Sequence, residues 1–115
     1  MRRGDVVLVD LDPARPSESA KTRPAILVSN DGANRTAQQL GRGVVTIVPL
    51  TTNVRRIYAF QVLLPARSAG LRQASKAQAE QIRSVSVDRI LDTIGHLEPE
   101  RMRELDDALR LHLDL

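Results

Sequence analysis

Two residues whose side chains suit a phosphate group stand beside short β-branched runs. Arg23 closes the segment Lys21-Thr22-Arg23, just before the run at residues 25–29, and Thr51 follows the run at residues 44–50. A guanidinium and a hydroxyl at neighbouring strand ends could hold and polarise a phosphodiester. The chain has no cysteine, and its two histidines, His96 and His112, stand near its end. Arg23 and Thr51 are therefore the best candidates for phosphodiester chemistry.

The charge distribution also favours a polyanionic partner. Residues 1–85 contain 13 basic and 6 acidic side chains, whereas residues 86–115 contain 4 basic and 8 acidic ones. Arginine, whose planar fork pairs with phosphate and stacks on bases, supplies 15 of the 17 basic residues. The alternative is a solvated surface that reflects coding bias alone. The basic excess does not by itself decide between these two interpretations.

Length and composition limit the class of protein. A chain of 115 residues that is 42% hydrophobic suits one domain spanning residues 1–115. The absence of cysteine excludes disulfides and thiolate chemistry and favours a cytoplasmic location. No apolar segment approaches the roughly 20 residues of a membrane span, so no membrane partner is expected. No His/Asp/Glu cluster has metal-ligand spacing, so we predict neither a metal nor a cofactor.

The pattern of apolar runs and turn residues predicts a mainly β protein with a terminal helix. Strands are expected at residues 6–11, 25–29, 44–50, 59–64, 79–85 and 93–97. Residues 30–34 are read as a loop, and one helical turn is expected at residues 36–40 and another at 87–91. A helix over residues 99–113 begins at Pro99, which is tolerated in a first helical turn. These elements fit a small SH3-like β-barrel, or curled antiparallel sheet, with a C-terminal α-helix.

Five short motifs, in order along the chain, resemble the MazF/PemK/Kid toxin endoribonucleases. They are Gly4-Asp5-Val6-Val7 with Asp12-Pro13, Glu18 in the next loop, Arg23-Pro24, Pro49-Leu50-Thr51-Thr52-Asn53, and Glu80-Gln81-Ile82-Arg83-Ser84. The resemblance covers essentially the whole chain and implies a fold of the CcdB/PemK type. It also implies a homodimer that cleaves single-stranded RNA sequence-selectively without a metal. An antitoxin, expected to be acidic and partly disordered, would neutralise it.

The resemblance assigns roles to particular residues. Arg23 would stabilise charge on the phosphorane oxygens, and Thr51 would bond the scissile phosphate or the attacking 2′-hydroxyl. Arg23 could instead form a surface ion pair with Glu18 or Asp12, and Thr51 could instead cap the turn into Asn53. Glu80 would act as general base or hold Arg83. Catalysis is thus assigned to Arg23, Thr51 and Glu80, and RNA binding to Glu18, Lys21, Thr52, Asn53, Arg55, Arg56, Gln81, Arg83 and Ser84.

Some positions depart from the family pattern. Gln78 stands where some relatives have an arginine two residues before the acid, and Ser17 stands where some have a histidine. A second cationic catalyst and a histidine-based scheme therefore do not carry over, and His96 and His112 are read as structural. Two alternative functions remain. One is a barrel that binds nucleic acid without cleaving it, and the other is a toxin of the same fold that binds DNA gyrase, as CcdB relatives do. The latter rely on an aromatic C-terminal end, which this chain lacks.

Overall fold

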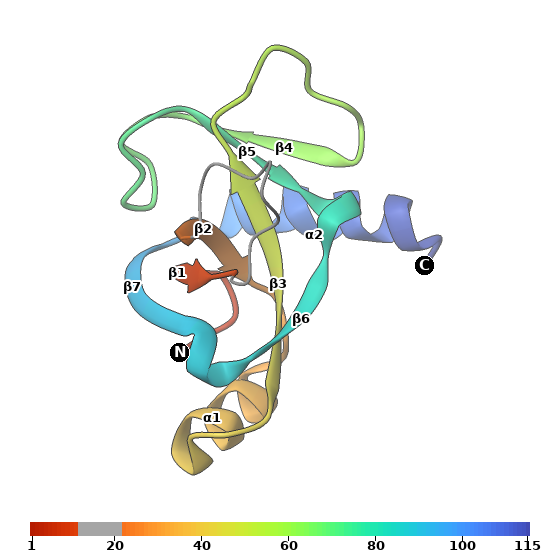
Figure 1. The fold of residues 1–115 in the computed structure, drawn as a ribbon. Coiled ribbons are helices and arrows are strands. Elements are labelled where there is room, and N and C mark those ends of the chain that lie inside the picture. The colour runs from red at the N-terminus through yellow and green to blue at the C-terminus, as the bar shows by residue number, and fades with distance from the viewer. Residues whose placement is uncertain (12–21) are drawn as a thin grey trace.

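The computed structural model describes residues 1–11 and 22–115, which form one antiparallel sheet and two α-helices (Figure 1). The strands are β1 (Asp5–Asp10), β2 (Thr22–Leu27), β3 (Val44–Thr51), β4 (Gln61–Leu64), β5 (Ser75–Gln78), β6 (Arg83–Ser86) and β7 (Ile90–His96). The helices are α1 (Asp31–Leu40) and α2 (Pro99–Leu113), and the single 3₁₀ turns are η1 (Ala79–Gln81) and η2 (Val87–Arg89). The predicted fold class, a small curled β-sheet with a C-terminal helix, is confirmed.

Strand β3 organises the sheet. The strand order is β4-β5-β3-β2-β1-β7, and β6 also pairs with β3. One edge of β3 therefore carries β2, while its other edge carries β5 near its end and β6 near its start. The β-branched residues of β3 explain this central position, because Val45, Ile47 and Val48 are buried on its two faces.

The strand predicted over residues 79–85 is present only from Arg83, as β6, because residues 79–81 form η1. Along β3, Leu50 pairs with Ala77 of β5, whereas Ile47 pairs with Arg83 of β6. Between these two pairs, two residues of β3 thus face five residues of the opposite segment. The three extra residues form η1, which bulges out of the ladder. Strand β5, which precedes η1, is not among the predicted strands.

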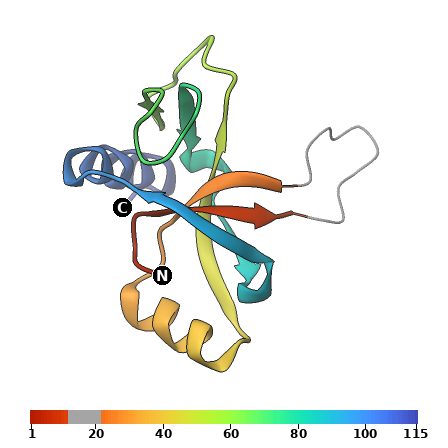
Figure 2. The same ribbon diagram turned by 90° about the vertical axis from the view of Figure 1, so that its left-hand side faces the viewer.

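Each face of the sheet covers its own apolar cluster. One cluster includes Val48, Leu50 and Leu64 and packs against Leu105 and Leu109 of α2. The other lies on the opposite face and is built from buried side chains of β1, β2, β3, β6, η2 and α1, namely Val7, Val9, Ala25, Leu27, Val45, Ile47, Val85, Val87 and Ala37. In Figures 1 and 2, α2 lies beside β4, and it also contacts η1, whereas α1 lies at the other end of β3. Helix α2 has the predicted bounds.

Helix α1 is longer than the one predicted turn, and the loop expected at residues 30–34 is wrong. Asn30 caps the helix by accepting a hydrogen bond from the amide of Ala33 at 2.8 Å. Asn34 is fully buried and donates to the carbonyl of Ser29 at 2.8 Å, which ties the first turn to the end of β2. Gly41 ends the helix with a left-handed backbone, φ 64°.

The remaining boundaries differ by a few residues. Strand β2 begins three residues earlier than predicted and contains Pro24, which lies opposite Leu8 of β1. Strand β4 begins two residues later than predicted, and β7 begins three residues earlier. The helical turn expected at residues 87–91 is present as η2 but ends at Arg89. Neither described helix is long and apolar enough to cross a membrane.

Candidate RNA-cleavage site

Three side chains form a row across β2, β3 and β5. Ala25 of β2 pairs with Pro49 of β3, and continuing this register by two residues brings Arg23 opposite Thr51. On the other edge of β3, Thr51 pairs directly with Lys76 of β5. Residues directly opposite on antiparallel strands share a face, with Cβ atoms about 4.5–5.5 Å apart. Thr51 thus lies directly opposite Lys76, and Arg23, two residues beyond the last β2–β3 pair, falls on the same face on the other side of Thr51; we call these three residues the cross-strand row.

The sheet separates the hydroxyls of Thr51 and Thr52, which are adjacent in the sequence. Thr52 and Pro24 together line a hollow of about 430 Å³ that also includes Leu71 and Ile94. Because adjacent residues of a strand point to opposite faces, this hollow lies on the side away from Arg23 and Thr51. Of the two threonines, only Thr51 shares the face of Arg23.

The Thr51 hydroxyl already has one partner. Its Oγ1 accepts a hydrogen bond from the backbone amide of Asn53 at 3.2 Å, and Asn53 Oδ1 accepts one from the amide of Arg55 at 3.3 Å. The turn-capping role considered for Thr51 is thus present in the structure. A hydroxyl that accepts one bond can still donate its proton, so capping and phosphate binding are compatible.

Arg23 is partly buried, and its side chain makes no hydrogen bond or ion pair with the described residues. Its opposite neighbour on β1 is Val9, which is buried in the apolar cluster. On the β1 side, the neighbour of Arg23 is therefore apolar and offers the guanidinium no side-chain acceptor. Glu18 and Lys21, predicted to contact RNA, and the proposed ion-pair partner Asp12 lie outside the described residues.

Glu80 lies in the η1 bulge and bonds Gln61, not Arg83. Gln61 Nε2 donates to Glu80 Oε2 at 2.6 Å, while Gln61 Oε1 accepts from the amide of Tyr58 at 3.1 Å. The other oxygen, Glu80 Oε1, is buried and has no hydrogen-bond partner among residues 1–11 and 22–115. The carboxylate thus joins η1 to the segment at residues 52–60 and retains one acceptor without a partner. The sequence pattern gave no sign of Gln61, because its role depends on the bulge.

The segment at residues 52–60 projects beyond β3 and carries most of the exposed predicted RNA contacts (Figure 1). Arg56 Nη1 donates to the Tyr58 hydroxyl at 3.2 Å, and its guanidinium carbon lies 5.7 Å from the centre of that ring. Tyr58 stacks on Phe60 with ring centres 5.3 Å apart. Arg55 is exposed beside them. The two aromatic rings of the chain therefore lie together, next to cations.

The predicted contacts in the fifth motif do not all share a face. Arg83 lies opposite Ile47 of β3, on the same face as the row but four residues along β3 from Thr51, or about 13 Å. Ser84 lies opposite Thr46 and so points to the other face. Gln81 is exposed in η1. Arg83 therefore shares a face with Arg23 and Thr51 but lies farther along the sheet, whereas Ser84 lies on the opposite face.

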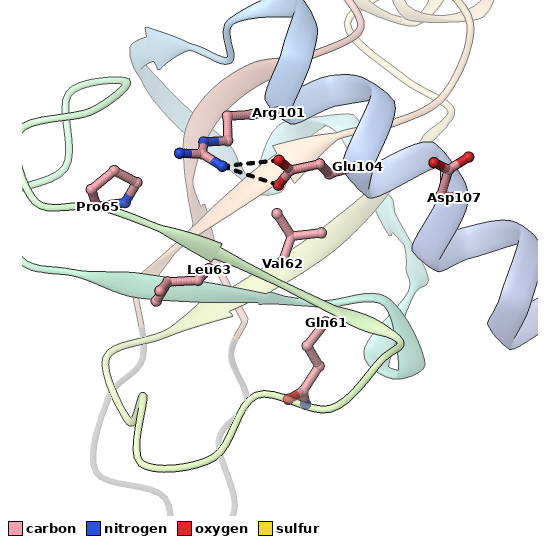
Figure 3. A pocket seen from close by; sticks show the side chains of 7 residues that line it. All are labelled: Gln61, Val62, Leu63, Pro65, Arg101, Glu104 and Asp107. Atoms are coloured by element: carbon pink, nitrogen blue, oxygen red, sulfur yellow. Dashed lines mark hydrogen bonds and ion pairs between the residues drawn. The ribbon is translucent and has the colours of Figure 1, made fainter.

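A second hollow, of about 510 Å³, lies between β4 and α2 (Figure 3). Arg101 and Glu104 form an ion pair at 2.9 Å along its helical wall. Figure 3 shows Val62 pointing toward α2, whereas Gln61 points to the opposite side of β4. This hollow is therefore separated by the strand from the polar contacts of Gln61.

The two histidines lie on different elements, and each contacts a residue outside the cross-strand row. His96 Nδ1 bonds Asp5 Oδ1 at 2.8 Å and thereby links the ends of β7 and β1. His112 is exposed on α2, and its ring centre is 6.4 Å from that of Phe60. His112 thus lies at the border of the helix face that packs on the sheet.

Comparison with known proteins identifies the family. The family model described as the PemK-like, MazF-like toxin of type II toxin–antitoxin systems matches residues 2–113. The chain is 56% identical to the endoribonuclease MazF9 of Mycobacterium tuberculosis over 115 residues, covering all of this chain and 98% of the relative. It is 31% identical to the endoribonuclease EndoA of Bacillus subtilis, covering all of this chain and 96% of the relative.

Solved structures agree with the sequence comparisons. A mycobacterial endoribonuclease in complex with its cognate antitoxin matches with a TM-score of 0.78 and 27% identity, covering all of this chain and 96% of the other. A MazF structure from Deinococcus radiodurans matches with a TM-score of 0.77 at 23% identity, which supports the fold alone. The resemblance drawn from the five motifs is confirmed: the chain belongs to the PemK/MazF toxin family of type II toxin–antitoxin systems.

Proposed function

We propose that this chain is an endoribonuclease toxin that cuts single-stranded RNA sequence-selectively and without a metal. Membership of the family, and the naming of both curated relatives as endoribonucleases, support the reaction class. The observation that carries the proposal at this site is the cross-strand row, because it supports Thr51 with a cation on each side. This arrangement matches the charge that develops on a phosphodiester during cleavage.

The proposed reaction uses the RNA's own 2′-hydroxyl as nucleophile. Its oxygen attacks the adjacent phosphorus and loses a proton, and the bond between phosphorus and the 5′-oxygen breaks as that oxygen gains a proton. The products are a 2′,3′-cyclic phosphate and a 5′-hydroxyl. Arg23 would donate two hydrogen bonds to the non-bridging oxygens, and the Thr51 hydroxyl would fix the phosphate or the nucleophile.

Glu80 is the proposed general base. Its Oε1 atom is buried without a hydrogen-bond partner, so it could accept a proton from a bound hydroxyl. Gln61 holds the other carboxylate oxygen and would keep the group oriented. The predicted RNA contacts divide by position. Arg55 and Arg56 would bind bases or phosphates beside the cut, whereas Arg83 would contact the strand farther along the same face.

Regulation by an antitoxin is part of the proposal. One solved relative is bound to its cognate antitoxin, and an acidic, partly disordered segment would complement the basic row and Arg55 and Arg56 here. Such a segment would block RNA both electrostatically and sterically. We further propose that the chain acts in the cytoplasm as a homodimer, as the family resemblance implies.

The test is incubation of purified protein with mixed RNA in excess EDTA, with sequencing of the new 5′ ends. We expect cuts at one short recurrent motif. Arg23→Ala should lower the rate by about 100-fold or more while leaving the fold intact. Arg35→Ala is the matched control, because Arg35 is exposed on α1 at the other end of β3. Intact RNA with retained binding would instead identify a barrel that only binds nucleic acid.

A further inference from the structure

Lys76 is a buried cation without an acidic partner among the described residues. The residue is only 8% exposed, and its Nζ donates to the carbonyl of Arg56 at 2.7 Å. The centre of the Tyr58 ring lies 6.0 Å from Nζ. No ion pair joins Lys76 to Glu80, whose hydrogen-bonded oxygen faces Gln61. Burying an ammonium group is unfavourable unless it is paired, so its position calls for an explanation.

The location of Lys76 supplies an explanation for its burial. It lies directly opposite Thr51 and on the face of the sheet that carries Arg23. An ammonium group has three N–H donors, and the Arg56 carbonyl takes one of them. Two donors therefore remain for another acceptor, on a residue whose strand position is opposite Thr51. An anion bound at Thr51 would give this buried cation the partner that the described residues do not provide.

We propose that Lys76 binds the scissile phosphate of RNA from the side opposite Arg23. This inference rests on the proposed ribonuclease function and adds a second cation to it. By bonding the Arg56 carbonyl, Lys76 also couples the segment at residues 52–60 to the row, so that the site and its flanking contacts are fixed together. Gln78, two residues along the same face of β5, is uncharged and does not provide this charge.

Two substitutions separate the effect of the Lys76 charge from the effect of its hydrogen bond to the Arg56 carbonyl. Lys76→Gln retains an N–H that can reach a carbonyl but removes the charge, whereas Lys76→Arg retains the charge. On a mixed-sequence RNA that 2′-O-methylation makes uncleavable, Lys76→Gln should reduce the slope of log Kd against log salt by about 0.7, the value of one phosphate contact to a single strand. Lys76→Arg should restore the slope. On cleavable RNA, Lys76→Gln should lower kcat/KM by about 10- to 100-fold.

Arg35→Gln, the same change of charge on α1, is the control and should leave the salt slope within error of the wild type. An unchanged slope in folded Lys76→Gln protein would overturn the inference, and so would an equal drop in Arg35→Gln. If the unsubstituted protein leaves cleavable RNA intact, the ribonuclease proposal fails instead. The salt slope still tests the phosphate contact in that case, since it requires no cleavage.

A measurement on the unsubstituted protein covers the case in which Lys76 variants do not fold. Lys21 and Lys76 are the only two lysines in the chain, so NMR of ¹⁵Nζ-labelled lysine gives at most two ammonium signals. Lys21→Arg identifies the signal of Lys76. Addition of the 2′-O-methylated RNA should shift the Lys76 signal, and inorganic phosphate at higher concentration should shift it in the same direction. A Lys76 signal that stays unchanged at saturating RNA would contradict the proposal.

Discussion

The Thr51 hydroxyl can both cap the turn at Asn53 and bind a phosphate, and the adjacent Thr52 provides a control. Thr51→Val removes both the acceptor for the Asn53 amide and the proton that a phosphate oxygen would receive. We expect kcat to fall by about 100-fold, the usual effect of deleting one donor to a developing oxyanion. Thr51→Ser, which keeps the hydroxyl, should stay within about tenfold of the wild type.

Thr52→Val is the matched control, because Thr52 lines the hollow on the other face of the sheet. Its cleavage rate should remain within about threefold of the wild type, allowing for loss of the weak surface contacts of one hydroxyl. The measurement is the single-turnover rate on an RNA that contains the mapped cut site. Equal losses in Thr51→Val and Thr52→Val would contradict the assignment of Thr51 to the row.

The candidate residues could be predicted more readily than their surroundings. Arg23 and Thr51 were found because their side chains have phosphate chemistry and border β-branched runs, and the structure places them on one face. The position of Lys76 opposite Thr51 could not be predicted, because Ser75–Gln78 has too few apolar residues to resemble a strand. One face of that short strand is covered by the segment at residues 52–60, whose path depends on tertiary contacts.

Among the elements, α2 was predictable and the segment from β5 to β6 was not. Pro99 marks the start of α2, and its apolar residues recur at helical spacing, so both signals are local. The three-residue bulge at η1 arises from a change in pairing register along β3, which no local pattern encodes. Helix α1 did have local signals, Asn30 as cap and Gly41 as terminator, but Gly32 and two asparagines made its first turn resemble a loop.

The start of β1 and the end of β7 are joined by a carboxylate whose stabilising effect depends on pH. Burial alone raises the pKa of the Asp5 carboxyl, but the Arg2 amide and the His96 ring outweigh this and lower the pKa below its usual value. A lowered folded-state pKa stabilises the fold above the unfolded value of about 3.9, and this contribution is lost as the pH falls through the folded-state value.

Asp5→Asn should therefore reduce the free energy of unfolding by about 1–3 kcal/mol at pH 7, and the difference from the wild type should shrink below about pH 4. Urea unfolding at several pH values measures this difference. Asp88→Asn is the control, because Asp88 is exposed in η2. A difference that stays constant from pH 7 to pH 3 would show that the charge of Asp5 does not stabilise the strand ends.

A close backbone contact holds the segment after β4 against β7. A Cβ atom added at Gly95 would lie 2.0 Å from the carbonyl oxygen of Ala69, so the backbone itself would have to move. Gly95→Ala should destabilise the protein by about 2 kcal/mol or more, measured by urea unfolding. Gly32→Ala is the control, because its added Cβ would meet only the Asn30 side chain, at 3.3 Å. A Gly95→Ala protein as stable as the wild type would mean that this contact readily relaxes.

At the scale of the whole molecule, the chain divides its charges between its two ends. The basic excess lies in residues 1–85, which supply the row and the exposed arginines beside it, whereas the final 30 residues are acidic overall and include α2. RNA at the row therefore meets cations from β2, β5 and the segment at residues 52–60, whereas α2, which has four acidic residues and three arginines, lies across the hollow from β4 (Figure 3). This division favours one orientation of a polyanion on the sheet.

The same division predicts that an acidic polypeptide inhibits RNA cleavage without any specific sequence. Poly-aspartate, used as a probe for an acidic antitoxin segment, should compete with RNA at low salt, so that KM rises while kcat stays constant. The inhibition should weaken markedly between 50 and 200 mM salt, since screening reduces attraction between exposed charges. Poly-lysine at the same concentration, with its binding to RNA subtracted, tests for nonspecific polymer effects. Two outcomes would contradict this prediction: poly-aspartate lowers kcat and leaves KM unchanged, or it has no effect at low salt. In either case charge alone does not direct an acidic partner to this face, and antitoxin recognition would depend on apolar contacts instead.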